Sequence, residues 1–368
     1  MSSISKYAAP RIPAESSSTL PAAYTYIDLQ ARGAVARQGP RVIFIEVTNH
    51  CNLLCETCPR TFVSYEEPKT LAWDDFLRIV EQFPDMQRAV LHGIGEPLMN
   101  HDLPRMIEYL KTRNVTVLFN TNATLLNEAW GRKLIASGLD EMRCSLDGAD
   151  PQTYAEIRGA PLLHKIVKNL REFTQLQREL GAATPRVSIW MTGMRENIRE
   201  LPDLVRLAAH MGIGEVYVQR MVYPLDTADD PGMFGPGHAL ADDFDSIADE
   251  CIATAEAVGQ ELGVVLRASG ATDPRHSLEA VVRQPDPRPW AACLRPWTTA
   301  YVTANGNCLP CCISPFATSD YESLKMGNLF DQDFTHIWND ARYQQWRVQL
   351  LSDQPAKPCA GCGVHWSL

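Results

Sequence analysis

The sequence predicts an α/β protein built around a parallel sheet. From about residue 40 to about residue 222, short apolar runs of strand length alternate with longer segments whose apolar residues repeat at the helical period. Strands that alternate with helices form βαβ units with right-handed crossovers. A closed or partly closed barrel and an open doubly wound sheet both fit this alternation. In both architectures, functional residues gather at the carboxyl ends of the strands.

Six segments are expected to be strands, because they have strand length and are rich in Val and Ile. They are residues 42–47, 88–92, 115–119, 141–146, 187–191 and 215–219. Five segments between them are expected to be helices, and Gly138 and Gly212 stand where two of these helices would end. The expected helices are residues 73–83, 103–112, 127–137, 163–179 and 201–210.

The chain is expected to divide into four parts that differ in composition. The N-terminal part is rich in Ser, Ala and Pro, and the C-terminal part is rich in Cys and Trp. Between the barrel and the C-terminal part, a helix is expected at about residues 244–262. The four parts are an N-terminal extension (1–38), a core barrel (39–235), a helical linker (236–289) and a small Cys-rich domain (290–368).

Composition excludes several classes of protein. The 368 residues carry a formal net charge of −10, whereas sequence-independent nucleic-acid binding needs clustered Lys and Arg. No apolar run approaches the roughly 18 residues of a membrane span, and the first residues lack the apolar stretch of a secretory signal. We therefore expect a cytoplasmic protein with no nucleic-acid or membrane partner. Its eleven cysteines are then expected to stay reduced and to serve as metal ligands or catalysts.

Three cysteines follow the first predicted strand at C-x3-C-x2-C spacing, namely Cys51, Cys55 and Cys58. Three thiolates on one loop bind three corners of a [4Fe–4S] cluster and leave the fourth iron without a protein ligand. An open coordination position on a metal is where chemistry takes place. The alternative is a zinc loop completed by His50 or by a distant residue. This spacing fits zinc poorly, because zinc sites favour paired C-x2-C units.

This spacing resembles the cluster loop of the radical S-adenosylmethionine (SAM) enzymes, and the resemblance extends from residue 41 to about residue 222. It implies a partial (β/α)6 barrel. It also implies that the open iron chelates the amino and carboxylate groups of SAM, and that one electron, delivered by a flavodoxin or ferredoxin, leads to cleavage of the sulfonium. In that family, the resulting 5′-deoxyadenosyl radical abstracts a hydrogen atom from the substrate, so the cofactor carries the difficult chemistry.

Two motifs after the second and third strands add to this resemblance. HGIGEP is similar to the Gly-Gly-Glu-Pro segment of the family. There, Gly95 would let the backbone approach the methionine ammonium, and Glu96 would accept a hydrogen bond from it. FNTNA resembles the segment that would place Asn122 near the ribose. Each motif alone is also typical of an ordinary turn.

Three further motifs follow in the order that the family shows. CSLDG after the fourth strand would place Ser145 and Asp147 near SAM. Arg158 in EIRG resembles the arginine that pairs with the SAM carboxylate, a role suited to a guanidinium group. VYVQRM at the end of the sixth strand would place Gln219 near the adenine or the substrate. An Asp-Gly pair alone is typical of a turn, and a lone arginine of a solvated charge.

Three residues are candidates for catalytic contact with the substrate. Tyr217 and Arg220 lie on the sixth predicted strand, near the end that would face the substrate. Cys144 precedes Ser145, and a thiol that lined the barrel there would return a hydrogen atom to a substrate radical. The alternative for Cys144 is a small, buried core residue.

A second set of cysteines stands in the C-terminal part. GNCLPCC contains a G-x4-C element that ends at Cys311, and CAGC is a C-x2-C pair. These elements resemble the short version of the SPASM region, called a twitch domain, which binds one auxiliary [4Fe–4S] cluster. The resemblance implies the ligands Cys293, Cys311, Cys359 and Cys362, with Cys312 as the rival of Cys311 and Cys308 as a spare thiol. A zinc ribbon is the alternative, because two cysteine pairs also hold tetrahedral zinc.

The sequence therefore predicts a radical SAM enzyme. Its small-molecule substrate is expected to be a sugar, aminoglycoside or nucleoside intermediate of natural-product biosynthesis, changed by dehydrogenation, epimerisation, dehydration or decarboxylation. This preference rests on compactness, since no extra domain that would grip a leader peptide is evident. Modification of a ribosomally made peptide is the second hypothesis, and a zinc-binding module without enzymatic activity is the third.

Overall fold

The computed structural model describes residues 32–222, 235–240, 245–268, 288–318 and 320–360. At its centre is a ten-stranded sheet with the order β10-β9-β8-β1-β2-β3-β4-β5-β6-β7. The strands are β1 (Val42–Ile45), β2 (Arg88–Val90), β3 (Thr116–Thr121), β4 (Glu141–Ser145), β5 (Arg186–Gly193), β6 (Glu215–Arg220), β7 (Val265–Ala268), β8 (Thr299–Val302), β9 (Asn307–Leu309) and β10 (Gly327–Asn328). The six strands expected from the alternation are β1 to β6, with ends that shift by a few residues.

The helices fall into a barrel group and a C-terminal group. The barrel group is α1 (Pro59–Phe62), α2 (Trp73–Val80), α3 (Leu103–Thr112), α4 (Glu128–Ala136), α5 (Pro151–Arg158), α6 (Leu163–Glu179), α7 (Leu201–His210) and α8 (Asp245–Leu262). The C-terminal group is α10 (Arg295–Thr298), α11 (Ser314–Ala317), α12 (Tyr321–Leu324), α13 (Phe334–Trp338), α14 (Ala341–Leu350) and α15 (Lys357–Ala360). All five helices expected between the strands form, as does the helix expected in the linker.

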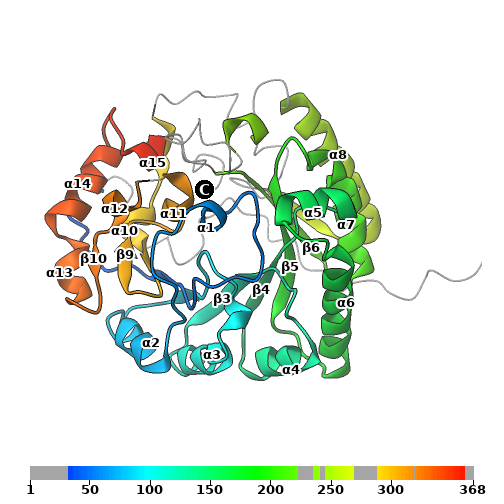
Figure 1. Ribbon diagram of the computed structural model, residues 1–368, viewed down its shortest axis with the longest axis horizontal. Coiled ribbons are helices and arrows are strands. Elements are labelled where there is room, and N and C mark those ends of the chain that lie inside the picture. The colour runs from blue at the N-terminus through cyan, green and yellow to red at the C-terminus, as the bar shows by residue number, and fades with distance from the viewer. Residues whose placement is uncertain (1–31, 223–234, 241–244, 269–287, 319, 361–368) are drawn as a thin grey trace, which may run out of the picture.

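The strands β1 to β7 are parallel, and each pairs with the next along the chain. Parallel neighbours need a crossover, which the helices supply. Figure 1 shows the sheet curving into an arc, with α2, α3, α4 and α6 along its outer side and α1 on its inner side. Because the second partner of β1 is β8 rather than a late barrel strand, the arc stays open. The predicted partial barrel is confirmed, and β7 is a seventh parallel strand that the sequence analysis did not predict.

Successive side chains on each strand face opposite sides of the sheet. On β4, Met142 and Cys144 are fully buried in the core that the sheet shares with the outer helices. Between them Arg143 points to the inner side of the arc, where its guanidinium lies over the ring of Trp190 at 4.2 Å from the centroid. The inner side also carries a small apolar cluster of its own, formed by Val42, Val90 and Leu118 with Phe44 packed against it.

The C-terminal region extends the same sheet. β8 pairs in parallel with β1, and β9 and β10 continue from β8 in antiparallel order. Backbone hydrogen bonds therefore join the Cys-rich region directly to the first strand of the barrel, which fixes the two regions against one another.

A buried carboxyl group at this junction connects β1 to the C-terminal region. Glu46, which follows β1 and is 2% exposed, accepts hydrogen bonds from the Tyr301 hydroxyl at 3.0 Å and from the backbone N–H groups of Ile94 at 2.9 Å and Ala304 at 3.3 Å. Burial raises the pKa of Glu46 to about 7, against the effect of these backbone N–H donors. The carboxyl group therefore changes charge near neutral pH.

A buried arginine ties several segments of the C-terminal region together. Arg347 on α14 is 0% exposed. Its Nε donates to the carbonyl of Pro296 at 2.9 Å and its Nη2 to that of Trp338 at 2.8 Å. Its Nη1 donates to the carbonyl of Ala34 at 3.1 Å and to Asn339 Oδ1 at 2.9 Å. A buried charge is tolerated when its donors are satisfied, as they are here.

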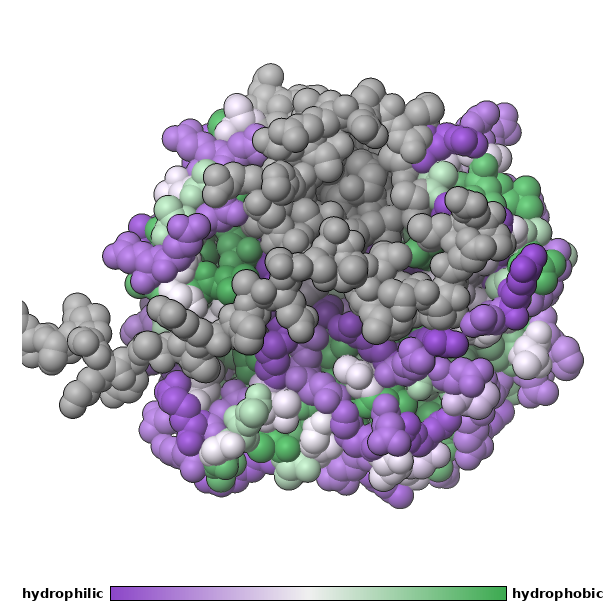
Figure 2. All heavy atoms as spheres, turned by 180° about the vertical axis from the view of Figure 1, so that it is seen from behind, coloured by the Kyte–Doolittle hydropathy of each residue, from purple (hydrophilic) through white to green (hydrophobic). Residues whose placement is uncertain are grey.

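The outer surface has the character expected around an α/β core. Among the described residues, no helix combines the length and the apolar composition that a membrane crossing requires. On the side shown in Figure 2, the described residues along the lower rim of the molecule are mainly hydrophilic, with smaller apolar areas between them.

The charge change of Glu46 predicts a pH dependence of stability. Between its ordinary pKa of 4.5 in the unfolded chain and about 7 in the folded chain, the folded state binds more protons, so the free energy of unfolding falls as the pH rises through this window. The substitution E46Q removes this contribution. We expect the melting temperature of E46Q to fall less than that of the unchanged protein between pH 5 and pH 8.

Thermal melts of both proteins across this range measure the difference. E128Q is the control, because Glu128 has a side chain that is 70% exposed on α4 and should leave the slope unchanged. Equal slopes for E46Q and the unchanged protein would contradict the assignment.

Candidate functional site

The three clustered cysteines lie on the loop between β1 and α1, at the carboxyl end of β1. Cys55 is buried, and Cys51 and Cys58 are half-buried. The first turn of α1 holds the loop, because Thr61 Oγ1 donates to the Cys55 carbonyl at 2.9 Å and the Thr61 N–H donates to the Cys58 carbonyl at 3.0 Å. The guanidinium of Arg60 donates to the carbonyl of Leu53 on the same loop. The loop is thus shaped by its own hydrogen bonds.

The surroundings of the thiols suit a metal cluster. Burial raises the pKa of Cys51, and burial followed by the charge of Cys55 raises that of Cys58 to about 12. A bound metal cation stabilises such thiols as thiolates. Two donors already face the sulfurs, since Asn122 Nδ2 lies 3.9 Å from Cys51 Sγ and Arg158 Nη1 lies 3.9 Å from Cys55 Sγ. In the described part of the chain, no three His, Cys, Asp or Glu side chains converge as closely as ligands of a single metal ion.

Gly95 packs against the cysteine loop. A Cβ atom on Gly95 would lie 2.1 Å from the Thr48 carbonyl oxygen and 2.7 Å from that of His50, so no larger residue fits. The next N–H, that of Glu96, donates to the His50 carbonyl at 2.8 Å. In the structure Gly95 makes room for the backbone that leads into the cysteines, and the expected approach of SAM to this residue stays a prediction.

The side chain of Glu96 accepts hydrogen bonds from residues at the end of β3. Its Oε1 accepts from Thr121 Oγ1 at 2.6 Å and from the Leu98 N–H at 3.1 Å, and its Oε2 accepts from the Asn122 N–H at 2.7 Å. Burial raises the pKa of this carboxyl group, whose exposure is 2%. A carboxylate has about four acceptor positions, so one position on Oε2 remains for the methionine ammonium expected from the sequence.

The side chain of Asn122 is occupied by the cysteine loop and its own turn. Its Nδ2 donates to Asn52 Oδ1 at 3.0 Å, besides facing Cys51 Sγ. Its Oδ1 accepts from the N–H and the hydroxyl of Thr124 at 2.9 and 2.6 Å. In the structure the amide positions the loop beside the first cysteine, and the contact of Asn122 with the ribose stays a prediction.

Asp147 and Arg158 form a buried ion pair next to Cys55. Arg158 Nη2 lies 2.7 Å from Asp147 Oδ2, and the Thr192 N–H donates to Asp147 Oδ1 at 2.7 Å. Although burial works against the cation, the carboxylate of Asp147 raises the pKa of Arg158, which stays charged. Nη1 faces the Cys55 sulfur, and Nε is buried and has no partner within the described part of the chain. The arginine expected to pair with the SAM carboxylate thus already has Asp147 as its carboxylate partner.

Four other residues were predicted to contact SAM or the substrate, and the structure describes the side chains of three of them. Ser145 at the end of β4 is half-buried and in register with Trp190. Tyr217 on β6 stacks on Trp190 with ring centroids 4.0 Å apart, and Gln219 Nε2 donates to Thr192 Oγ1 at 3.4 Å. These three residues line the inner side of the arc, as expected. Arg220 ends β6, and its side chain lies outside the described residues.

The prediction that Cys144 lines the barrel is wrong. Cys144 is 0% exposed and belongs to the outer core, one position out of phase with Arg143 and Ser145. Its thiol cannot reach a substrate on the inner side of the arc, so the alternative of a small core residue holds.

Three inward-facing residues were not predicted from the sequence, namely Asn120, Arg143 and Trp190. Asn120 and Arg143 are register partners on β3 and β4, and Trp190 lies across from Ser145 on β5. The signal for them was present in the sequence, because each is a polar or large aromatic residue that stands between two neighbours of which at least one is apolar and buried.

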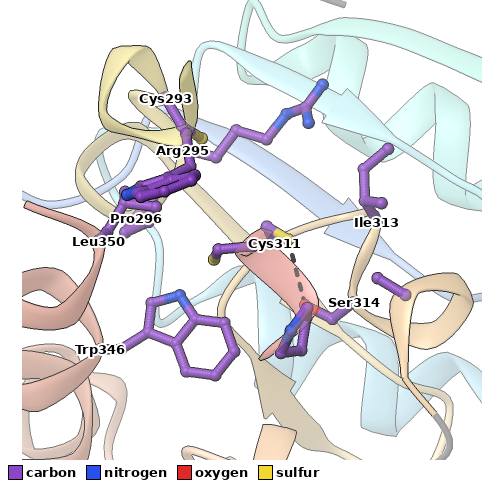
Figure 3. A pocket seen from close by; sticks show the side chains of 12 residues that line it. Cys293, Arg295, Pro296, Cys311, Ile313, Ser314, Trp346 and Leu350 are labelled. Carbon is purple, nitrogen blue, oxygen red and sulfur yellow. Dashed lines mark hydrogen bonds between the residues drawn. The ribbon is translucent and has the colours of Figure 1, made fainter. Parts of the chain in front are cut away.

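The auxiliary cysteines gather at a second site. A cavity whose empty space, including its open mouth, is about 400 Å³ lies between α10, the loop after β9, α14 and α15, and Cys293, Cys311 and Cys359 all line it. Figure 3 shows Cys293, Cys311 and Trp346 around this cavity from three different elements. Three of the four ligands expected from the resemblance therefore share one cavity. The fourth, Cys362, lies outside the described residues.

The structure separates the remaining C-terminal thiols from this cavity. Cys311 Sγ lies on the wall, 3.1 Å from Ser314 Oγ, whereas Cys312 is not among the lining residues. Cys308 is 0% exposed on β9, within the core. This arrangement agrees with the choice of Cys311 over Cys312 and with Cys308 as a thiol outside the ligand set.

Comparison with known proteins identifies both regions. The profile of the Radical SAM superfamily matches residues 45–208, and that of the SPASM iron-sulfur cluster-binding domain matches residues 293–363. The Pyrococcus furiosus tungsten-containing aldehyde ferredoxin oxidoreductase cofactor-modifying protein is 26% identical over 185 residues, covering 50% of this chain and 52% of the relative. The mycofactocin maturase MftC of Mycolicibacterium smegmatis is 27% identical over 168 residues, covering 45% of this chain and 41% of the relative. The chain thus spans about half the length of the curated relatives it matches.

Solved structures share the fold. SuiB of Streptococcus suis bound to S-adenosylmethionine superposes with a TM-score of 0.65 at 18% identity, over 88% of this chain and 73% of SuiB. The protein anSMEcpe with bound AdoMet superposes with a TM-score of 0.60 at 14% identity, over 85% of this chain and 84% of that one. Together with the profile matches, this assigns a [4Fe–4S] cluster with SAM to the barrel and auxiliary iron–sulfur binding to the C-terminal region. Iron–sulfur clusters therefore replace the zinc alternatives for both sets of cysteines.

Because Arg158 bridges Asp147 and the Cys55 sulfur, we expect its substitution to weaken SAM binding. R158K keeps the positive charge, but a single ammonium group cannot bridge Asp147 and the Cys55 sulfur as the guanidinium fork does. We expect the dissociation constant of SAM to rise about tenfold, which is ~1.4 kcal/mol, measured by equilibrium dialysis under anaerobic conditions. R171K on the exposed face of α6 is the matched control. An unchanged affinity in R158K would show that the fork does not organise the site.

The cavity walls predict which adjacent cysteine holds the auxiliary cluster. We expect C311A to lose roughly four iron atoms per chain and C312A to keep them, as measured by iron analysis of anaerobically purified protein. Each variant is the control for the other, because the two thiols differ by one position in the same loop. The opposite pattern would assign the cluster to Cys312.

Proposed function

Because the chain belongs to the radical SAM superfamily and carries a C-terminal SPASM iron-sulfur domain, we propose that it cleaves SAM reductively and abstracts a hydrogen atom from a small-molecule substrate. The observation that carries this proposal is the half-buried to buried trio Cys51, Cys55 and Cys58 at the carboxyl end of β1, with hydrogen-bond donors facing two of its sulfurs. Three thiol ligands leave one iron of a [4Fe–4S] cluster open to SAM.

The chain's own residues hold and orient this cofactor pair in the proposal. Cys51, Cys55 and Cys58 bind the cluster. The amide of Asn122 and the guanidinium of Arg158 lie against two of the sulfurs and favour their thiolate form. When bound, the reduced cluster and SAM supply the electron and the 5′-deoxyadenosyl radical for hydrogen abstraction. The electron donor in this proposal is a flavodoxin or ferredoxin, and a reducing cytoplasm suits both the clusters and the free thiols.

The inner side of the arc supports a compact substrate. Phe44, His92, Trp190 and Tyr217 all face it and are only partly exposed, and the first pair and the second pair form separate ring contacts. These four bulky side chains narrow the space on the inner side of the arc. We propose a sugar, aminoglycoside or nucleoside intermediate of natural-product biosynthesis as the substrate class, changed by dehydrogenation, epimerisation, dehydration or decarboxylation.

The auxiliary site completes the proposal. We assign the second [4Fe–4S] cluster to Cys293, Cys311, Cys359 and Cys362, of which the first three line one cavity. Four protein ligands leave no open iron, which favours electron transfer or structural support over direct binding of the substrate.

Modification of a ribosomally made peptide is the second candidate function. It is favoured by the match to the maturase MftC and by the shared fold of SuiB, which was crystallised with the precursor peptide SuiA. A gene for a short precursor peptide beside the gene of this protein would favour the peptide, and neighbouring sugar-pathway genes would favour the small molecule.

Removal of one cluster ligand tests the proposed chemistry. With two [4Fe–4S] clusters, the anaerobically purified protein should contain about eight iron atoms per chain, and C55A about four. Because the cluster provides the electron, C55A should lose at least 99% of the dithionite-dependent release of 5′-deoxyadenosine, measured by chromatography.

The matched control is C251A, since Cys251 lies on α8, away from both sets of clustered cysteines, and should keep iron and activity. Release of 5′-deoxyadenosine at an equal rate by C55A, or none by the unchanged protein, would end the proposal.

A further inference from the structure

The inner side of the arc carries a network of arginines and carboxylates. On strands between β2 and β7, four arginines contact two glutamates. Glu141 pairs with Arg143 at 2.7 Å, with Arg186 at 2.9 Å and with Arg88 at 3.5 Å. Glu215 pairs with Arg186 and, at 3.7 Å, with Arg267. Each of the two carboxylates is therefore shared among several guanidinium groups.

Arg143 precedes Ser145 on the inner face of β4, and Ser145 ends this strand at the carboxyl edge of the sheet, where the SAM-binding loop lies. Its Nε is bound to Glu141, and one face of the guanidinium covers Trp190. In the described residues, its Nη1 and Nη2 have no hydrogen-bond partner, although the side chain is only 19% exposed. A half-buried guanidinium whose Nη1 and Nη2 are open can donate two parallel hydrogen bonds to a carboxylate or a phosphate, and we call this pair of donors the fork.

Asn120 stands beside this fork. It is the direct register partner of Arg143 on the neighbouring strand, and both side chains point to the inner side. The Oδ1 atom of Asn120 is buried and has no hydrogen-bond partner among the described residues. Buried polar atoms are nearly always paired in a working protein. An unpaired amide oxygen next to the open Nη1 and Nη2 groups of Arg143 therefore indicates a place for a ligand that has a hydrogen-bond donor, such as a hydroxyl group, beside an acceptor.

Trp190 and Tyr217 add a flat apolar surface next to the fork. Their rings are stacked with an interplanar angle of 12°, and Trp190 is held by a hydrogen bond from its Nε1 to Ser188 Oγ at 3.0 Å. His92, whose ring lies against Phe44, is neutral, because burial followed by the charge of Arg143 lowers its pKa to about 3. A ligand that pairs with Arg143 can therefore lay a planar or ring-shaped body against these aromatic residues.

We propose that Arg143 binds an oxyanion of the substrate, a carboxylate or a phosphate ester, while Asn120 Oδ1 accepts a hydrogen bond from a hydroxyl group of the same substrate and the Trp190–Tyr217 pair supports the ring beside it. This inference rests on the proposed function, since it assigns the substrate of the same barrel. It narrows that substrate to an acidic sugar or a nucleotide-like compound, and it makes a polycationic aminoglycoside the least fitting of the three classes.

The binding of simple aromatic anions tests this site without turnover. The probes are benzoate, phenyl phosphate and the neutral benzamide, titrated calorimetrically into the cluster-containing protein with saturating SAM and no reductant. Because SAM is already bound, its own carboxylate cannot account for binding of the probes. We expect at least one anion to bind at least tenfold more tightly than benzamide, and the tighter of the two anions indicates which oxyanion the substrate carries.

Two variants of different kinds remove the site. R143Q removes the fork and leaves Glu141 paired with Arg186 and Arg88, so the fold has no new unpaired carboxylate. N120D changes no volume, and its carboxylate occupies the fork in place of the ligand. Each should weaken anion binding at least tenfold. The control R132Q removes an exposed arginine of α4 and should bind the anions as before.

Equal binding of benzoate, phenyl phosphate and benzamide, or unchanged anion binding in both R143Q and N120D, would overturn the inference. The readout is independent of SAM cleavage. A protein that binds the anions but releases no 5′-deoxyadenosine contradicts the proposed function alone, and one that releases it but does not distinguish anion from amide contradicts the anion site alone.

Discussion

The buried carboxylate of Glu96 is the contact on which the geometry of the candidate site depends. Through Oε1 and Oε2 it binds Thr121 and Asn122 at the end of β3, and its backbone N–H binds the carbonyl of His50. Asn122, fixed in this way, holds Asn52 and faces Cys51. One side chain therefore sets the position of the cysteine loop relative to two strand ends. A carboxylate with three donors around it tolerates burial, because these hydrogen bonds replace water.

The second constraint is the pairing of β8 with β1. The loop that carries Cys51, Cys55 and Cys58 follows one of these strands, and the turn that leads towards Cys308 and Cys311 follows the other. The registers Val42↔Thr299 through Ile45↔Val302 leave no freedom for the two cysteine regions to slide past each other. Glu46 and Tyr301 reinforce this junction at its carboxyl end. The distance between the two proposed clusters is thus a property of a continuous sheet, rather than of two domains that meet at a flexible interface.

The sequence was sufficient for the fold class, for six of the parallel strands and for the presence of two iron–sulfur regions, because spacing and periodicity are local signals. It was insufficient for contacts that depend on packing. The contacts of Gly95, Asn122 and Arg158 with SAM stay predictions. What the sequence did not show is that the same three residues lie against the cysteine loop.

The error at Cys144 has a different cause. A parallel strand is buried on both faces, so the run Met142, Arg143, Cys144 does not show which residues face inward until its neighbours on β3 and β5 are known. The short strand β7 escaped prediction because four residues carry little periodicity.

The inward orientation of Arg143 on β4 also relates the proposed substrate site to the auxiliary site. Arg143 lies close enough to the C-terminal region for its charge, together with that of Arg295, to act against the burial that raises the pKa of Cys312. The neighbouring Cys311 lines the auxiliary cavity. The charge of Arg143 thus acts on the dipeptide whose first cysteine lines that cavity. A substrate anion paired with Arg143 would offset this charge. Substrate binding would therefore change the electrostatic environment of the second cluster proposed there.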